Sequence, residues 1–182
     1  MPALSPESED GPDADQESVA RRILLERLTG APRSRAELEK SLAKKHVPAH
    51  VARKLLDRFT EVGLVDDEAF ARAWVESRQR GRGLARRALA VELHRKGIEP
   101  DVAADALADV AGEDEARVAR ELVRRKLRSV RAVPEPARSR RLLGMLARKG
   151  YSAGVAWSAI REELGADEQW RRSVEESAQP PG

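Results

Sequence analysis

Cysteine is absent from this sequence of 182 residues. Its absence excludes disulfides, thiolate nucleophiles, iron–sulfur clusters and zinc sites with Cys ligands. Histidine occurs three times, so a His-based metal or acid–base site has little material to draw on. Aromatic residues make up 3% of the chain, which predicts a thin core of Ala, Leu and Val.

Long apolar runs are also missing. No stretch approaches the roughly 18 consecutive apolar residues that a membrane span needs. The first ten residues lack the basic start and the apolar run of a signal peptide. We therefore expect a cytoplasmic protein with no membrane partner.

Charge, by contrast, is plentiful and segregated. Charged residues make up 36% of the chain, and residues 1–17 carry six acids with no Lys or Arg. Residues 72–96 then have a net charge of +6, residues 97–116 of −7 and residues 117–149 of +10. Such alternating blocks favour separate surfaces for separate partners, or one partner that carries both signs.

An internal repeat organises the middle of the chain. Residues 41–51, 92–102 and 145–155 align with offsets of 51 and 53 residues. A period near 50 in a helical sequence indicates one supersecondary unit used three times. The matching positions are Leu42, Leu93 and Leu146; Lys45, Lys96 and Lys149; and Val51, Val102 and Val155.

Each repeat is predicted to hold three helices, so the fold class is all-α with three tandem three-helix repeats. Ser34 with Glu37 forms a capping box, and Asp66 can cap the fourth helix. Gly97 and Gly150 suit the left-handed residue after a helix. His46 replaces this glycine in the first repeat, which we expect to end its second helix differently. The expected helices cover about 18–29, 35–45, 48–62, 67–80, 84–96, 100–110, 114–131, 136–149 and 153–164.

The predicted domain boundaries follow from this pattern. Residues 1–17 are expected to form a disordered acidic tail, and residues 166–182 a partly disordered C-terminal extension. The three repeats between them cover residues 18–65, 66–112 and 113–165. Each repeat supplies only a thin apolar face, so contacts between adjacent repeats should matter as much as contacts within one.

Three features are candidates for an enzymatic site. Gly81-Arg-Gly83 lacks the further residues of a dinucleotide or phosphate loop and is better explained as a turn. His46 and His50 are separated by Pro48 and lack further converging ligands. Asp101, Asp105 and Asp109 fit the solvated face of an Ala-rich helix. We therefore expect no catalytic residue, no metal and no cofactor.

A basic stripe on the helix near 115–131 is the strongest candidate for binding. Neighbouring like charges on a helix cost about 0.2–0.5 kcal/mol per pair, and in this helix only Glu121 relieves them. The stripe is explained either by an anionic partner or by a solubilising face. Its basic side holds Arg117, Arg120, Arg124, Arg128 and Arg131, and its apolar side holds Ala119, Leu122, Val123, Leu127 and Val130.

A second basic face lies on the helix near 84–96. With Leu89 and Leu93 as the core ridge, Arg87, His94 and Arg95 lie broadly opposite, where they could bind phosphates or an acidic protein surface. Stacking on single-stranded bases is not expected, because the aromatic residues mostly occupy core-like positions. These residues are Phe59, Phe70, Trp74, Tyr151, Trp157 and Trp170.

The first repeat suggests a different class of function. Residues 34–66 resemble the helix-turn-helix core of winged-helix transcription regulators. Those proteins continue into a β-hairpin wing, whereas residues 66–71 here begin another helix. Sequence-specific transcription control is therefore the alternative function.

The second repeat resembles the core signature of the RecX family. The matching residues are Gly63-Leu-Val-Asp-Asp-Glu-Ala-Phe-Ala-Arg-Ala-Trp-Val-Glu-Ser-Arg78, then Gly81-Arg-Gly83, then Glu92-Leu-His-Arg-Lys-Gly-Ile98. The resemblance implies a cytoplasmic, non-enzymatic regulator of the RecA recombinase in DNA repair and the SOS response. It also implies an elongated crescent of three-helix repeats that binds the RecA–DNA filament and suppresses its strand exchange, ATPase and coprotease activities.

The partners expected on this basis are the RecA filament and, weakly and non-specifically, DNA. We expect a monomer. The candidate contact residues for RecA or DNA are the two basic faces, namely Arg87, His94, Arg95, Arg117, Arg120, Arg124, Arg128 and Arg131.

Overall fold

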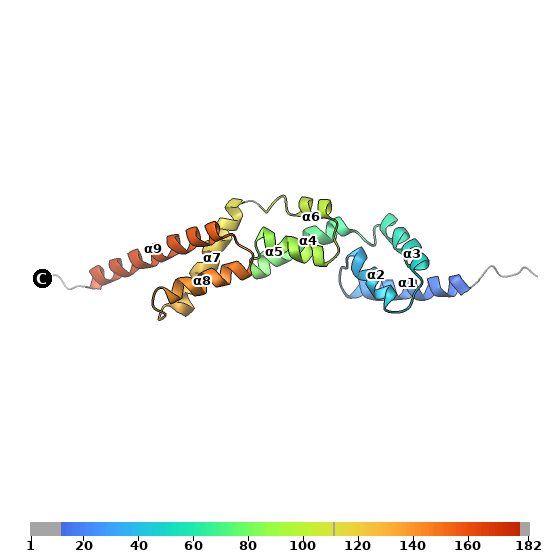
Figure 1. The fold of residues 1–182 in the computed structure, drawn as a ribbon, viewed down its shortest axis with the longest axis horizontal. Coiled ribbons are helices and arrows are strands. Elements are labelled where there is room, and N and C mark those ends of the chain that lie inside the picture. The colour runs from blue at the N-terminus through green and yellow to red at the C-terminus, as the bar shows by residue number, and fades with distance from the viewer. Residues whose placement is uncertain (1–11, 111, 179–182) are drawn as a thin grey trace, which may run out of the picture. The chain divides into compact units, whose positions relative to one another are not determined.

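The computed structural model describes residues 12–110 and 112–178, and every regular element in these ranges is a helix (Figure 1). The all-α class and the three tandem three-helix repeats are therefore confirmed. None of the helices in these ranges is both long and apolar enough to cross a membrane. The helices are α1 (Pro12–Gly30), α2 (Arg35–Ala43), α3 (Ala49–Glu61), α4 (Asp67–Arg82), α5 (Arg86–Arg95), α6 (Pro100–Ala106), α7 (Gly112–Val130), α8 (Ala137–Arg148) and α9 (Ala153–Ala178).

Helix α1 begins earlier than expected. It starts at Pro12 rather than near residue 18, and proline is well suited to the first helical position. Glu17 forms ion pairs with Arg21 (3.1 Å) and with Lys54 of α3 (3.2 Å). The prediction of disorder for residues 1–17 is therefore wrong for residues 12–17, and its remainder lies outside the described residues. The Lys54 partner lies far along the chain, so sequence spacing does not reveal it.

Helix α9 ends later than expected. It continues through Gly165 to Ala178, so residues 166–178 of the predicted extension are helical. A glycine inside a helix costs about 1 kcal/mol relative to alanine, which makes residue 165 a plausible end. Beyond this glycine, Asp167 forms an ion pair at 3.0 Å with Arg131, which directly follows α7. Residues 179–182 lie outside the described residues.

Helix α6 is shorter than the 100–110 expected from sequence. After Ala106 the backbone makes tighter turns, in which the Val110 N–H donates to the Leu107 carbonyl. The Leu107 carbonyl also accepts a hydrogen bond from Arg86 Nη1 at 2.9 Å. This arginine satisfies an oxygen that a longer helix would use for its own backbone bond. Leu107 and Val110 remain buried although they lie beyond the helix.

The described residues form two compact units rather than three. The first takes the described residues up to Ala73 together with Leu93–Ala103, and the second takes Trp74–Glu92 and the described residues from Ala104 onward. The division runs through α4, α5 and α6, so the middle repeat contributes to both units. A three-helix repeat with so few large side chains has little apolar area of its own to bury, and it shares the cores of its neighbours.

Each unit has its own apolar core. In the first unit, α1, α2 and α3 pack together, and in the second α7, α8 and α9 pack together (Figure 1). The predicted core ridge of α5 is confirmed, because Leu89 and Leu93 are fully buried. The first core is built on Ala20, Leu24, Leu38, Leu42, Val51, Ala52, Leu55, Leu56, Phe59 and Val65. The second is built on Ala85, Ala119, Leu122, Val123, Leu127, Val130, Leu142, Leu146, Tyr151, Ala156, Ala159 and Ile160.

The second helix of every repeat ends in the same backbone motif. A residue with positive φ follows the helix, and the next N–H donates back to the carbonyl of a buried leucine, as in a Schellman motif. The positive-φ residues are His46 (59°), Gly97 (74°) and Gly150 (89°), and the N–H groups of Val47, Ile98 and Tyr151 donate to the carbonyls of Leu42, Leu93 and Leu146 at 3.2, 3.1 and 3.2 Å. The expectation that the first repeat ends this helix differently is therefore wrong.

What differs between the repeats is the space around the positive-φ residue. A Cβ atom at Gly97 would lie 2.3 Å from the Cβ of Ala36, and one at Gly150 would lie 2.7 Å from the Ala88 nitrogen. The His46 side chain is exposed to solvent and meets no such obstacle. Glycine is thus required where the turn packs against the preceding repeat, and a short polar or ring side chain suffices where it does not.

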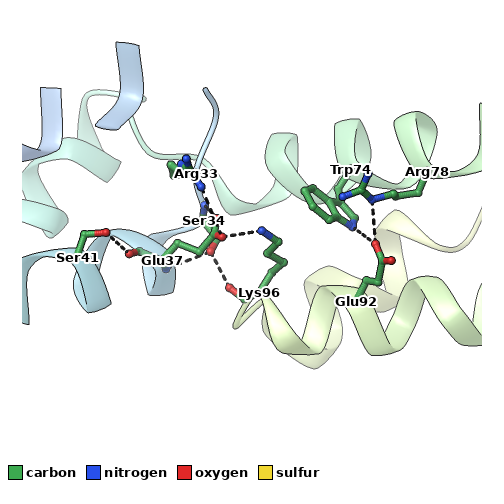
Figure 2. A network of polar contacts seen from close by, with 8 residues as sticks. All are labelled: Arg33, Ser34, Glu37, Ser41, Trp74, Arg78, Glu92 and Lys96. Atoms are coloured by element: carbon green, nitrogen blue, oxygen red, sulfur yellow. Dashed lines mark hydrogen bonds and ion pairs between the residues drawn. The ribbon is translucent and has the colours of Figure 1, made fainter. Parts of the chain in front are cut away.

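Both contacts between neighbouring repeats, which we call junctions, include a hydrogen bond to a lysine carbonyl. In the first unit the buried Ser34 hydroxyl donates to the Lys96 carbonyl at 2.6 Å (Figure 2). In the second unit the Ala85 N–H donates to the Lys149 carbonyl at 2.9 Å. Residues 34 and 85 are separated by the 51-residue offset of the repeat, and the lysines by its 53-residue offset. The same junction is therefore built twice with different donors.

The Ser34 hydroxyl has a second role, because it also accepts a hydrogen bond from the Glu37 N–H at 3.3 Å. The Glu37 side chain completes the predicted capping box, which is confirmed. Glu37 also forms an ion pair with the Lys96 ammonium at 2.6 Å (Figure 2). Helix capping and repeat packing thus use the same two side chains.

Replacement of the junction glycines tests this packing. Gly97→Ala and Gly150→Ala should each lower the free energy of unfolding by about 2–4 kcal/mol, because a Cβ adds both left-handed strain and a steric clash. His46→Gly is the matched control and should change it by less than about 1 kcal/mol. Urea unfolding followed by circular dichroism measures both. Equal effects of the three substitutions would contradict the role given to the close contact.

Tyr151 offers a second test, because it is the single tyrosine of the chain. Its hydroxyl donates to the Gly83 carbonyl at 3.1 Å, and burial, with a smaller effect of Glu115 and Glu121, raises its pKa to about 12. The protonated phenol is favoured in the folded state, so its contribution to stability is present below pH 10 and is lost as the pH rises through about 12.

Tyrosinate absorbance of the folded protein should therefore rise only well above about pH 10, together with a loss of helical signal. In urea, where the chain is unfolded, the same titration should give a tyrosine pKa of about 10. Tyr151→Phe should abolish the absorbance change. A normal titration near pH 10 with unchanged helix content would show that Tyr151 is not held in this junction.

Candidate nucleic-acid and protein interface

Helix α7 has the two faces that the sequence predicts. The five residues of its predicted apolar side are all buried in the core of the second unit. Its arginines lie on the opposite side, but most of them contact acids of the same unit. The predicted cationic stripe of α7 is therefore largely neutralised within the fold.

Three arginines of the stripe pair with α9: Arg120 and Arg124 of α7, and Arg131, which directly follows it. Arg124 makes two hydrogen bonds to Glu163, at 2.9 and 2.8 Å, and the Glu163 side chain is 7% exposed. These bonds raise the pKa of Arg124. The more exposed Arg120–Glu162 pair lies at 3.1 Å and Arg131–Asp167 at 3.0 Å. Together they hold the polar edges of α7 and α9 against each other.

Arg117 pairs within α7 itself. It contacts Asp114 at 3.2 Å and Glu121 at 2.9 Å, and hydrogen bonds to these two acids raise its pKa. The expectation that Glu121 alone relieves the stripe is therefore wrong. The other acids come from α9, between 36 and 42 residues away along the chain, which a single-helix pattern does not reveal.

The remaining predicted residues are exposed. Arg87, His94 and Arg95 of α5 and Arg128 of α7 lie on the surface and have no ion pair within the described ranges. Val91, also on α5, is 46% exposed. These four basic side chains keep their full capacity to bind an anionic partner.

A basic groove that the sequence does not predict lies between α7 and α8. It has a volume of about 590 Å³ and is lined by Lys126, Ser129, Val130, Arg140, Arg141, Gly144, Met145 and Arg148. Among the described residues, no carboxylate lines it, and its four cations have no ion pair. The sequence does contain a signal for this groove within residues 117–149, the block of net charge +10. Arg148 follows Arg141 by seven residues and Arg140 by eight, so the three arginines share a helix face.

Lys149, which follows α8, does not line this groove, because its ammonium donates to the Arg82 carbonyl. The Lys149 ammonium has a pKa lowered by burial first and then by Arg125 and Arg82. Its charge is therefore used within the fold and does not belong to the groove.

The signature residues Trp74, Arg78 and Glu92 have a structural role in the second unit. The Trp74 indole N–H donates to Glu92 at 2.9 Å, and Arg78 donates to the same carboxylate at 3.0 Å (Figure 2). The Arg78 guanidinium lies 4.0 Å from the centre of the Trp74 ring, a cation–π contact. This cluster joins α4 to α5.

The aromatic residues are distributed largely as predicted. Phe59, Phe70 and Tyr151 are buried and Trp74 is half-buried, but Trp157 of α9 is 43% exposed and is not a core residue. The Trp170 side chain lies outside the described residues.

The three candidate enzymatic features lie in unremarkable surroundings. Gly81 lies in the last turn of α4, and a Cβ at Gly83 would lie 3.1 Å from Leu122, so this turn is set by packing. Asp101, Asp105 and Asp109 are exposed. Within the described ranges no three His, Cys, Asp or Glu side chains converge as metal ligands would.

Comparison with known proteins gives consistent matches over most of the chain. Residues 66–107 match the family model for the second three-helix domain of RecX, and residues 113–160 match that for the third. A regulatory protein RecX from Thermobifida fusca is 48% identical over 92% of this chain and 94% of its own length. One from Streptomyces coelicolor is 47% identical over 88% of this chain and 92% of its own length.

Solved structures agree on the fold. A crystal structure of regulatory protein RecX has a TM-score of 0.73 at 26% identity, over 83% of this chain and 74% of its own. The RecX structure from Lactobacillus salivarius has a TM-score of 0.74 at 19% identity, over 82% of this chain and 97% of its own. The latter likeness concerns the fold alone.

Two neighbouring glutamates of α9 test the structural role of the arginine stripe. Glu163→Gln should lower the free energy of unfolding by about 1–3 kcal/mol, because it weakens two charge-assisted hydrogen bonds at a buried carboxylate. Glu162→Gln breaks an exposed pair and should cost less than about 1 kcal/mol. Thermal unfolding followed by circular dichroism distinguishes them. If both variants unfold like the parent, the stripe does not fasten α7 to α9.

Proposed function

The chain belongs to the RecX family, and from this premise we propose that it regulates the RecA recombinase by binding the RecA–DNA filament. The observation that carries the proposal is the 48% identity to a regulatory protein RecX over 92% of the chain. The protein acts in the cytoplasm by binding rather than by catalysis, and its function lies in the control of DNA repair and recombination.

The contact residues we propose are those members of the two predicted basic faces that have no ion pair among the described residues. These are Arg87, His94 and Arg95 of α5 and Arg128 of α7. Arg117, Arg120, Arg124 and Arg131 already have acidic partners in the second unit, so a filament would have to compete with them. An unpaired cation gains more from an anionic surface because it gives up no internal bond.

Inhibition follows from several modest contacts made at once. A monomer with basic residues on successive repeats can contact more than one subunit of a helical filament, and its separate contacts add through effective concentration. Such bridging hinders the motions of filament subunits that accompany ATP turnover, and it restricts access to the bound DNA. Direct binding to free DNA remains weak, because it depends on phosphate charges rather than on base edges.

The α5 cations provide the decisive test. Added well below one molecule per RecA protomer, the protein should slow the DNA-dependent ATPase of RecA from the same host. Arg87→Glu combined with Arg95→Glu should weaken this inhibition at physiological salt, since it reverses two proposed contacts. Arg53→Glu with Arg58→Glu makes the same charge change at two exposed positions of α3 and should inhibit like the parent. Circular dichroism checks that both variants keep the parent helix content.

Inhibition that is equal in the parent and in the α5 variant would refute the proposed contact surface. A complete absence of inhibition would refute the regulatory function itself. The winged-helix alternative predicts instead a footprint confined to one operator-like DNA site. It is disfavoured by α4, because residues 67–82 form a helix where such regulators have their β-hairpin wing.

A further inference from the structure

The groove between α7 and α8 differs from the rest of α7 in how its charge is handled. On the side of α7 that faces α9, acids neutralise Arg120, Arg124 and Arg131. On the side that faces α8, the described lining of the groove contains four cations and no acid. The same helix thus presents a neutralised edge and an uncompensated edge.

Uncompensated cations around one hollow raise the energy of the folded state. Lys126 of α7 and Arg140, Arg141 and Arg148 of α8 carry like charges around one groove, and as exposed groups they repel one another most at low salt. An anion in the groove would relieve the repulsion. Three of the four side chains are arginines, whose planar guanidinium groups match the oxygen pairs of a phosphate.

The shape of the groove suits a chain of phosphates. Gly144 lies in its lining and contributes no side chain, and Arg148 Nη1 lies 3.4 Å from where a Cβ at this position would be. The remaining lining residues are Ser129, Val130 and Met145, and the Ser129 hydroxyl already donates to the Lys126 carbonyl at 2.9 Å. None of them offers the amide or carboxylate groups that read base edges. The polar groups of the groove are therefore mainly cations, which suit a phosphate backbone.

We propose that the α7–α8 groove binds the sugar–phosphate backbone of single-stranded DNA without sequence preference. This proposal rests on the DNA-binding part of the proposed function and assigns it to a site on the third repeat. The groove lies wholly within the second unit, so its four cations are held by one packed core. An acidic protein surface is the competing occupant, and DNA-binding measurements in the absence of RecA separate the two.

The first experiment measures the affinity for DNA by fluorescence anisotropy with a labelled oligothymidylate and no RecA present. Arg140→Gln combined with Arg141→Gln should weaken binding by roughly tenfold at moderate salt. It should also lower the slope of log affinity against log salt by about 0.7 for each phosphate that the variant no longer binds. Arg117→Gln with Arg120→Gln is the matched control. It removes the same charge from the same unit, at residues that are already ion-paired, and it should change the affinity less than about twofold.

The second experiment fills the groove without changing its charge. Gly144→Leu places a side chain among the four cations, and leucine favours the helix more than glycine does. Binding of the oligothymidylate should fall by at least about fivefold while helix content and net charge stay at their parent values. A merely electrostatic surface would not respond to this substitution.

Two results would overturn the proposal. If the groove variant and the control variant lose equal affinity for the oligothymidylate, binding depends on net charge alone and is not localised in the groove. If the groove variants bind the oligothymidylate like the parent, the groove is not a nucleic-acid site, and an acidic protein surface is the better occupant. Because this assay contains no RecA, its failure is distinguishable from failure of the ATPase assay, which tests the regulatory function.

Discussion

Close packing of a side-chain-free turn against the preceding repeat is the constraint on which the two units depend. At Gly97 and Gly150 the backbone of one repeat approaches an alanine of the repeat before it, and a single added carbon would lie within 2.7 Å of that neighbour. The approach brings a lysine carbonyl within hydrogen-bonding distance of the preceding repeat in both cases. With few aromatic residues to fill space, small residues at the junctions let thin helical layers share their apolar faces.

Electrostatics in the second unit serves two separate purposes. Arginines of the α7 stripe that face α9 are paired with acids and hold the two helices together. The cations around the α7–α8 groove, three of which are arginines of α8, have no acid among the described lining residues. A count of basic residues does not distinguish these uses, because both kinds belong to the same charge block. The distinction lies in which neighbouring helix each face of α7 meets.

The sequence is a good guide wherever the determining signal is local. The three-helix repeats, the Ser34–Glu37 capping box, the buried face of α7 and the Leu89 and Leu93 ridge follow from spacing along one helix, and the structure has them. The ends of α1 and α9 do not follow, because Glu17 and Asp167 contact partners that are distant in the sequence, namely Lys54 and Arg131. For the same reason the sequence identifies the arginines of α7 but not their acids on α9. It also does not reveal the groove, which exists only once α7 and α8 are packed together.

The double role of Ser34 bears on how cooperatively the first unit unfolds. In arrays of repeats, stability divides into terms intrinsic to each repeat and terms for the interface between neighbours. The Ser34 hydroxyl contributes to both at once, since it caps α2 and bonds the carbonyl of Lys96 in the following repeat. Fraying of the first turn of α2 therefore also breaks the bond to the next repeat. Intrinsic and interfacial stability rise and fall together at this point, which sharpens the transition between the folded and unfolded states of the unit.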